Sequence, residues 1–328
     1  MKTTKLLLFN LLLSTLLFSC NNNKIQKILL PSVSGKAGDV LMVIDMPYWE
    51  AELGNDLRFL LTKEYPYLPQ REPLFNLYNA PHKAFSGSFV THRNIIVVNV
   101  GEKYDTAEVS IKKDVWAAPQ LVITVSAPDQ ESARKIVAEK SEIITNALEQ
   151  SERDRIIASS KKYQEVNLRS IVLEKHGKSP YFPKGFSLKK NTKDFTWISY
   201  ETTYINRGIF IYEYDYNSAA DITTSGIIKH RNEMLQANVP GMFDNSYMTT
   251  GNFFPPTTKW ITYKNNSFAE TRGLWEVQND YMGGPFISHC HIDEERGKII
   301  VIEGFVYAPK HDKRNYLRYV EAVLYSFE

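Results

Sequence analysis

Cysteine is almost absent from this chain: its 328 residues contain two, Cys20 and Cys290. Two cysteines permit at most one internal disulfide, so packing rather than a disulfide framework must hold the fold together. Net charge is also small, with 39 basic and 37 acidic residues. No polybasic block of the kind that binds nucleic acid or anionic headgroups interrupts this balance. These shortages exclude a disulfide-rich scaffold and argue against nucleic acid as a partner.

Long apolar runs are scarce as well, and the most prominent one lies at the start of the chain. It extends from Leu6 to Phe18, after the basic residues Lys2 and Lys5. A helix of that length covers roughly 20 Å of a hydrocarbon core about 30 Å thick, which is too little to span a bilayer. A basic start followed by a short apolar run is typical of a cleaved export signal.

The leader ends in Leu17-Phe18-Ser19-Cys20, which resembles the lipobox of a bacterial lipoprotein. The resemblance implies that residues 1–19 are a signal peptide and that Cys20 becomes the first residue of the mature chain, with a diacylglycerol on its sulfur. Phe18 is bulkier than the usual residue at its position. An ordinary signal peptide that happens to contain Cys20 is the alternative. If Cys20 carries lipid, Cys290 has no internal partner and the protein works beside a membrane.

Residues 20–38 are expected to form a lipidated tether, because Asn21 to Gly38 are rich in Asn, Ser and Gly and show no sustained periodicity. Eighteen residues reach at most about 60 Å when fully extended. That length can lift a domain off a bilayer surface.

Residues 39–178 are expected to form an N-terminal half that mixes helices and strands. Apolar runs predict strands at 40–44, 95–98 and 121–125, and Pro47 is suited to the first turn of a helix. Asp129 is placed to cap a further helix. From Asp129 to His176 the sequence has neither glycine nor proline. This stretch predicts a long central helix, either continuous or broken near Ser159-Ser160.

The breaker-rich segment 179–185 marks the start of the C-terminal half, residues 179–328. Strands are predicted near 186–188, 195–201, 208–216, 259–263, 270–278, 285–291 and 298–307, and helices at 221–238 and 312–327. Asp293 to Gly297 form a predicted hairpin turn. The fold class that follows is α+β: two mixed halves with mostly antiparallel sheets and a long central helix.

Two polar clusters interrupt apolar surroundings and are the first candidates for a ligand site. His92 and Arg93 come just before the strand at 95–98, and Arg93 could hold a carboxylate or phosphate. Gly283 and Gly284 precede the strand at 285–291, where missing side chains would let the backbone approach a ligand. Ordinary turn chemistry is the commoner explanation of both clusters.

Aromatic and metal-binding patterns give weaker candidates. Tyr212 and Tyr214 share one strand face and could stack against a sugar ring, although core packing is the commoner use of such a ladder. His289 and His291 also share a strand face and are weak candidates for metal ligands, because a zinc site needs three or four ligands. The alternative is a half-exposed strand with a small buried thiol at Cys290.

Signatures of catalysis and cofactor binding are missing. The sequence contains no Gly-x-Gly-x-x-Gly, no Walker lysine and no Gly-x-Ser-x-Gly. Four Ser-x-x-Lys spacings occur without the motifs that accompany them in enzymes. We therefore predict no cofactor and no catalytic residues, which leans against an enzyme.

Several long phrases, among them THRNIIVVNV, RGLWEVQNDYMGGPF and EGFVYAPKHDKRNYLRYVEAVLYSF, resemble a Bacteroidetes lipoprotein family known as domain of unknown function 4837. The resemblance runs from about Ser34 to Phe327. It implies a membrane-anchored setting in a cell with two membranes, but no activity and no catalytic residue. Because Asn21 to Lys24 lack the acidic residues that direct some such lipoproteins to the cell surface, the outer membrane facing the periplasm is the expected location.

The function expected from the sequence is that of a non-enzymatic binding or assembly module of the cell envelope, held to the membrane through Cys20. Its partner would be an envelope protein or a glycan. The alternative is an envelope glycan-binding protein or hydrolase that uses His92, Arg93 and the face formed by Tyr212 and Tyr214.

Overall fold

The computed structural model describes residues 29–328, of which residues 32–328 form one compact unit. Cys20 and the expected signal peptide lie outside the described residues. Helices and strands occur together throughout, which confirms the α+β class. The α-helices are α2 (Met46–Trp49), α3 (Glu52–Leu61), α4 (Gln130–Glu139), α5 (Ser141–Lys162), α6 (Val166–His176), α7 (Thr224–Asn238) and α8 (Arg314–Leu324).

A five-stranded sheet lies in the N-terminal half, with strand order β2-β1-β3-β5-β4. β1 pairs in parallel with β2 and β3, and β3 pairs in parallel with β5; only the β4–β5 pair of this sheet is antiparallel. The prediction of mostly antiparallel sheets is therefore wrong for this half. Its strands are β1 (Asp39–Val43), β2 (Asn76–Ala80), β3 (Asn94–Val100), β4 (Glu108–Lys113) and β5 (Leu121–Ala127).

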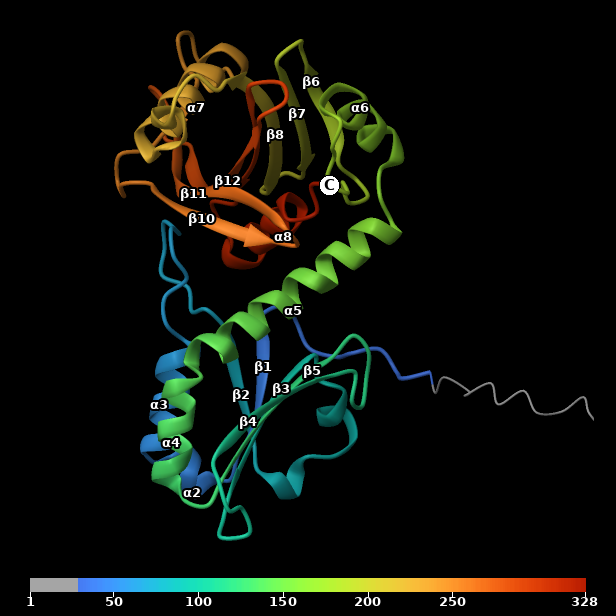
Figure 1. Cartoon of the computed structure of the whole chain (residues 1–328), viewed down its shortest axis with the longest axis vertical. Helices are drawn as coiled ribbons and strands as arrows, with labels where there is room; N and C mark the ends of the chain where they lie inside the picture. Colours follow the sequence, from blue (N-terminus) through green and yellow to red (C-terminus); the bar gives the residue numbers. More distant parts are fainter. Residues whose placement is uncertain (1–28) are drawn as a thin grey trace, which may run out of the picture. The chain divides into compact units, whose positions relative to one another are not determined.

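All five residues of β1 are buried, so both faces of the strand are covered. One face packs on α3, α4 and α5 through residues such as Leu57, Val137 and Leu148. The other face packs on Phe85 and Trp116 in the loops. Strands covered on both faces are typical of parallel sheets, in which a helical crossover such as α2–α3 returns the chain to the same edge. Figure 1 shows α3 and α4 beside this sheet.

The segment without glycine or proline forms three helices, α4, α5 and α6, instead of one continuous helix or one helix with a single break. Asp129 caps α4 as expected, because its Oδ1 accepts from the Ser132 amide at 2.8 Å. The break between α5 and α6 falls at 163–165 rather than at Ser159-Ser160. There the Glu165 amide donates to the Phe182 carbonyl at 2.8 Å, so pairing with a distant loop ends the helix.

The C-terminal half contains an eight-stranded sheet whose main path is β10-β11-β12-β13-β8-β7-β6, with β9 paired to β11. Its pairings are antiparallel. The strands at 195–201 and 298–307 have the bounds predicted from the sequence. The strands are β6 (Ser187–Asn191), β7 (Phe195–Glu201), β8 (Asn206–Asp215), β9 (Met248–Thr250), β10 (Thr257–Tyr263), β11 (Asn266–Val277), β12 (Gly283–Asp293) and β13 (Lys298–Tyr307).

Helices cover both faces of this sheet. Ile227 and Leu235 of α7 pack on one face in a core that includes Phe210 and Phe305. On the opposite face, Val320 and other apolar residues of α8 pack against Ile209 and its neighbours. Figure 1 shows α7 and α8 at these places. The core under α7 opens at the sheet end where β8 begins and β13 finishes.

Candidate functional site

An apolar pocket of about 320 Å³ lies at that end of the eight-stranded sheet. None of the residues that line it is charged. Its methionine side chains are flexible and polarisable, so they can adapt to the shape of a bound molecule. The lining consists of Trp197, Asn206, Val239, Pro240, Gly241, Met242, Met248, Trp275, Val277, Met282, Phe305 and Tyr307. We call it the Trp197 pocket.

Strand register brings these residues together. Trp197 of β7 pairs with Phe210 of β8, and Asn206 is the first residue of β8 on the same face. Phe305 of β13 lies opposite Gly208. A Cβ on Gly208 would lie only 1.9 Å from the Phe305 ring, so a glycine is required for this ring to lie flat against β8. The turn after α7, which begins at Val239, supplies another wall.

Two polar atoms of the Trp197 pocket are buried without a hydrogen-bond partner among residues 29–328. They are the donor Nε1 of Trp197 and the acceptor Oδ1 of Asn206. The Asn206 amide nitrogen donates to Oε1 of Glu201 at 3.4 Å, and this contact orients the amide oxygen away from the carboxylate. By contrast, Nε1 of Trp275 donates to the Val306 carbonyl at 3.2 Å. Eleven further side-chain atoms of the described residues are buried without a partner, among them Nε2 of His176 and Nε2 of His291, so the two atoms do not by themselves mark a ligand site.

Gly283 and Gly284, predicted as a site where backbone could approach a ligand, line an adjoining pocket of about 390 Å³. Trp275 and Met282 belong to both pockets, so the two cavities share a wall. A Cβ on Gly284 would lie 2.1 Å from the Val306 carbonyl oxygen. The close approach of β13 to β12 therefore requires a glycine at position 284, and this explains Gly284 without a ligand.

His92 and Arg93 lie at the other sheet, where internal partners occupy them. Nη2 of Arg93 lies 2.9 Å from Oε2 of Glu152, whose side chain is 2% exposed. Glu152 Oε1 accepts from Asn94 and Arg155. His92 Nδ1 lies 3.1 Å from the Asn94 carbonyl oxygen, and burial lowers the pKa of its imidazole. The arrangement ties α5 to the start of β3.

Tyr212 and Tyr214 lie under α7. The Tyr212 side chain is 1% exposed and belongs to the core of the eight-stranded sheet. Burial raises the pKa of the Tyr212 phenol well above its usual value. Tyr214 stacks on the ring of His230 at 4.0 Å, and its hydroxyl donates to the Asp221 carbonyl. Both rings thus take part in packing between the sheet and the segment that leads into α7.

His289 and His291 lie on the face of β12 covered by α8. His289 is fully buried, stacks on Phe268 at 4.1 Å and has Nε2 3.3 Å from Oε2 of Glu270. Burial lowers the pKa of His291 to about 3, so its imidazole is neutral at physiological pH. Within residues 29–328, no group of three or more His, Cys, Asp or Glu side chains is arranged to hold a metal ion.

A further cavity, about 820 Å³, is polar and is lined partly by His291. His176 also lines it, with Nδ1 2.5 Å from Oε1 of Glu213. Burial raises the pKa of Glu213, but the hydrogen bonds from His176 and Arg296 outweigh burial and hold it below its usual value. Glu213 is therefore paired with His176 and Arg296 beside this cavity.

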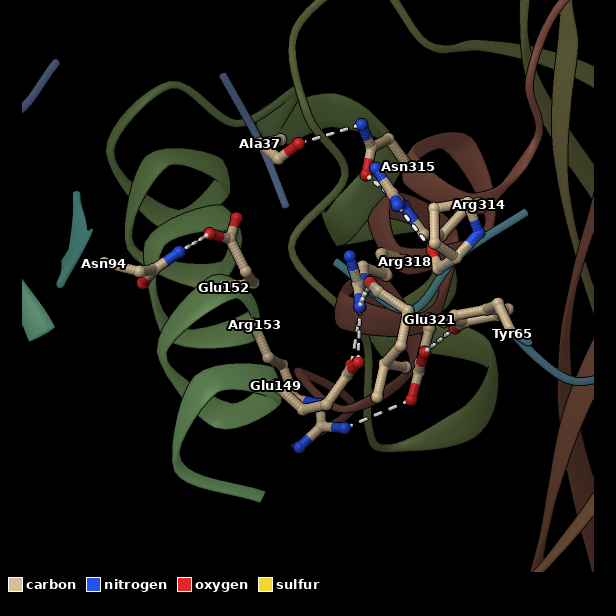
Figure 2. Close-up of polar contacts among 12 residues, drawn as sticks. Ala37, Tyr65, Asn94, Glu149, Glu152, Arg153, Arg314, Asn315, Arg318 and Glu321 are labelled. Atoms are coloured by element: carbon tan, nitrogen blue, oxygen red, sulfur yellow. Dashed lines mark hydrogen bonds and ion pairs between the residues drawn. The ribbon is translucent and has the colours of Figure 1, made fainter. Parts of the chain in front are cut away.

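Sequence reasoning missed a network of buried charges between α5 and α8. Figure 2 shows Arg318 reaching Glu149, and Glu321 accepting from both Arg153 and Tyr65. Arg272 of β11 donates to the same Glu321 carboxylate at 2.8 Å. Glu72 in the α3–β2 loop accepts from the Lys313 and Arg314 amides at the start of α8. These contacts join the two halves. The sequence did not predict them, because the residues look like ordinary charged positions of amphipathic helices.

The structure does not bring the two predicted polar clusters together. Gly283 and Gly284 share a pocket with Trp275 and Met282, whereas Arg93 and His92 bond to α5 and β3. Trp197 and Asn206, the residues with unmatched polar atoms, were not singled out from the sequence. No local signal identifies them, because their role depends on which strand ends meet. In the described part of the chain, no helix is both long and apolar enough to cross a membrane.

Two family models match successive parts of the chain. Residues 165–326 match the family described as Domain of unknown function (DUF4837), and residues 33–161 match Domain of unknown function (DUF8532). No curated protein matches the sequence. The solved human StarD13 (DLC2) lipid transfer and protein localization domain is similar over 50% of this chain and 95% of that chain, at 11% identity and a TM-score of 0.23, a level that carries no conclusion. The two family matches support membership of an uncharacterised family.

Proposed function

We propose that this chain is a lipid-anchored, non-enzymatic binding protein of the cell envelope that takes a small ligand in the Trp197 pocket. The observation that carries the binding function is the uncharged, concave cavity itself, about 320 Å³, in which Met242, Met248 and Met282 lie beside aromatic rings. Ligand sites are typically concave and lined mostly by apolar and aromatic side chains.

The anchor rests on the sequence. The Leu17-Phe18-Ser19-Cys20 motif supports lipidation of Cys20, and the absence of acidic residues at Asn21 to Lys24 supports the periplasmic face of the outer membrane. Two or more acyl chains hold a protein on a membrane essentially permanently. Labelling cells with radioactive palmitate tests this: the wild-type chain should incorporate label and sediment with outer membranes. A Cys20→Ser variant that still incorporates label would overturn it.

Binding is tested by offering the protein an extract of its own cell envelope. The chain from residue 20 onward, with Cys20→Ser, is incubated with the extract, separated from unbound material and analysed by mass spectrometry. We expect at least one small molecule to be retained in a stoichiometric amount. Met282→Trp, which adds bulk to the wall shared by both pockets, should abolish retention.

Ile143→Trp is the matched control, because Ile143 is half-exposed on α5 and lines neither pocket. The Ile143→Trp variant should retain as much of the molecule as the protein with Ile143 does. Equal retention by the Met282→Trp and Ile143→Trp variants would show that the molecule binds outside the Trp197 pocket.

A further inference from the structure

We propose that two exposed loop segments of the C-terminal half insert into the lipid bilayer that carries the anchor. The segments are 239–256, which runs from the end of α7 through β9 to β10, and 278–282, which joins β11 to β12. The inference rests on the proposed lipidation of Cys20 and adds a second contact between the protein and the bilayer. The exposed apolar side chains of these segments, which we call the loop patch, are those of Met242, Phe243, Phe253, Phe254 and Tyr281.

The loop patch concentrates large apolar side chains in contact with solvent. Among residues 29–328, five phenylalanines are exposed, and three of them belong to the patch. Met242 is 82% exposed and Phe253 is 77% exposed, although side chains of this kind are usually buried. A single exposed apolar side chain needs no explanation, whereas a group of them marks a surface that contacts another molecule or a membrane.

The exposed side chains of the two segments lie around the same pair of cavities. The rings of Phe253 and Phe254 are 4.7 Å apart. Phe253 and Tyr281 line the pocket of about 390 Å³ described above. Met282 separates this pocket from the other one, which Met242 lines. The loop patch is therefore one surface rather than a set of scattered positions.

Hydrogen bonds hold the turns that present these side chains. The Ser246 hydroxyl accepts from the Phe243 amide at 3.0 Å, and the Ser246 carbonyl accepts from the Gly241 amide at 2.8 Å. In the other segment, the Asp280 carboxylate accepts from the Tyr281 amide at 2.6 Å. Since the turns are already ordered, insertion loses less conformational entropy than it would for unstructured loops.

A bilayer suits this surface better than a folded partner does. The apolar side chains project from separate turns, so a protein would need a rigid surface with a matching hollow for each of them. Headgroups and acyl chains rearrange around such tips, and aromatic side chains favour the membrane–water interface. Between Cys20 and Ser32, where the compact unit begins, the chain spans at most about 40 Å. A lipid on Cys20 would therefore keep the bilayer at a high local concentration, at which even weak insertion is populated.

Charge determines which lipids the loop patch should enter. Segments 239–256 and 278–282 contain no Lys or Arg, and their charged residues are Asp244 and Asp280. A third carboxylate, that of Glu276, lines the pocket beside them. Anionic headgroups attract basic clusters and repel carboxylates. The loop patch should therefore insert by burial of apolar surface into bilayers of zwitterionic lipid, without help from anionic lipid.

The test measures whether the loop patch reaches the hydrocarbon region of a bilayer. The chain from residue 20 onward is coupled through the Cys20 thiol to a maleimide lipid in phosphatidylcholine vesicles, while Cys290 is fully buried and stays unreacted. Phe253→Trp adds one indole to the patch. Phe59→Trp is the matched control, because Phe59 is 82% exposed on α3, outside the patch. Phosphatidylcholine brominated in the middle of its acyl chains should quench the added fluorescence of Phe253→Trp and leave that of Phe59→Trp unchanged.

A second substitution measures the contribution of one ring. Phe243→Ser, made in the Phe253→Trp protein, should lower the ratio of inserted to free protein roughly tenfold, because one phenyl ring fewer is buried. Phe59→Ser in the same protein should leave the ratio unchanged. Adding phosphatidylglycerol to the vesicles should not increase the quenching. Urea unfolding midpoints report whether each variant is folded.

Failure of this inference and failure of the proposed anchor give different results. Equal quenching of Phe253→Trp and Phe59→Trp, or quenching of neither, overturns insertion and leaves the anchor to the palmitate experiment. Quenching that appears only with phosphatidylglycerol and disappears in high salt overturns insertion through apolar surface. A dimer in sedimentation that Phe253→Ser dissociates would assign the loop patch to a second copy of the chain and also overturn the inference. Quenching of Phe253→Trp alone, together with no palmitate on Cys20, would support insertion and overturn the anchor.

Discussion

Arg231 and Glu303 form a buried ion pair. Removing one of the two charges should lower the free energy of unfolding more than removing both. Arg231 of α7 and Glu303 of β13 are both fully buried, and two hydrogen bonds of 2.9 and 2.8 Å join them. Arg231 also donates to Thr250 and lies 3.8 Å from the centre of the Phe286 ring. Burial raises the pKa of Glu303 although Arg231 opposes the shift, so desolvation exceeds the benefit of pairing.

We expect Glu303→Leu alone to lower the free energy of unfolding by about 3–5 kcal/mol, because it leaves the Arg231 guanidinium charged and unpaired in an apolar core. The double variant Arg231→Met with Glu303→Leu should recover that loss and reach wild-type stability or exceed it by about 1–3 kcal/mol. Methionine can pack on Phe286 where the guanidinium lay.

Urea unfolding followed by tryptophan fluorescence measures both values, since the midpoint and slope give the free energy of unfolding. The surface pair Lys298–Asp215 on the same sheet is the matched control, and its double replacement should leave stability unchanged. A Glu303→Leu cost below about 1 kcal/mol, or a double variant no more stable than the single one, would mean that the core tolerates an unpaired Arg231.

Three further predictions concern other parts of the fold. Burial lowers the pKa of His291 to about 3 in the folded chain, whereas an exposed histidine has a pKa of about 6.5. Between these pH values the unfolded chain binds the proton and the folded chain does not. The contribution of His291 to the free energy of unfolding should therefore be full above about pH 6.5 and decline as the pH falls toward 3. His291→Phe should flatten that decline in urea titrations, and an unchanged slope would contradict the assignment. Glu321→Gln removes the charge shared by Arg153, Arg272 and Tyr65, so it should cost about 3 kcal/mol in the same assay, and a neutral result would mean that the network adds nothing. Gly284→Ala places a Cβ against the Val306 carbonyl and should cost about 1–3 kcal/mol, whereas Gly101→Ala, with open space around it, should be tolerated; equal effects would count against the close approach of β13.

Periodicity predicted the elements well where one pattern dominated. The predicted bounds of the strands at 195–201 and 298–307 match β7 and β13, and the turn from Asp293 to Gly297 lies between β12 and β13 as expected. Periodicity did not predict the parallel pairing of β1. A strand that is apolar on both faces carries no pattern that indicates the direction or register of its neighbours. Periodicity also placed the break in the central helix too early, since the break depends on a hydrogen bond from Glu165 to the distant Phe182.

The candidate site was only partly predictable for a related reason. Gly283 and Gly284 stood out because glycine has a strong local signature, and they do line a cavity. Trp197 and Asn206 lie in ordinary strand sequence, and only the pairing of β7 with β8 brings them into one pocket. Arg93 stood out as a residue that could hold a carboxylate or phosphate of a ligand, but the carboxylate that it contacts is Glu152 of α5, 59 residues along the chain.

Whether the Trp197 pocket binds a molecule of the cell envelope can be measured at the indole signal of Trp197, whose ring lines the pocket. A nitrogen-15 spectrum of the chain from residue 20 onward is recorded with and without envelope extract. We expect a saturable shift of the Trp197 signal that Met282→Trp abolishes, while the signal of Trp260, which is 55% exposed and outside the lining, stays in place. A Trp197 signal that stays fixed while the extract saturates the protein would mean that this pocket binds nothing.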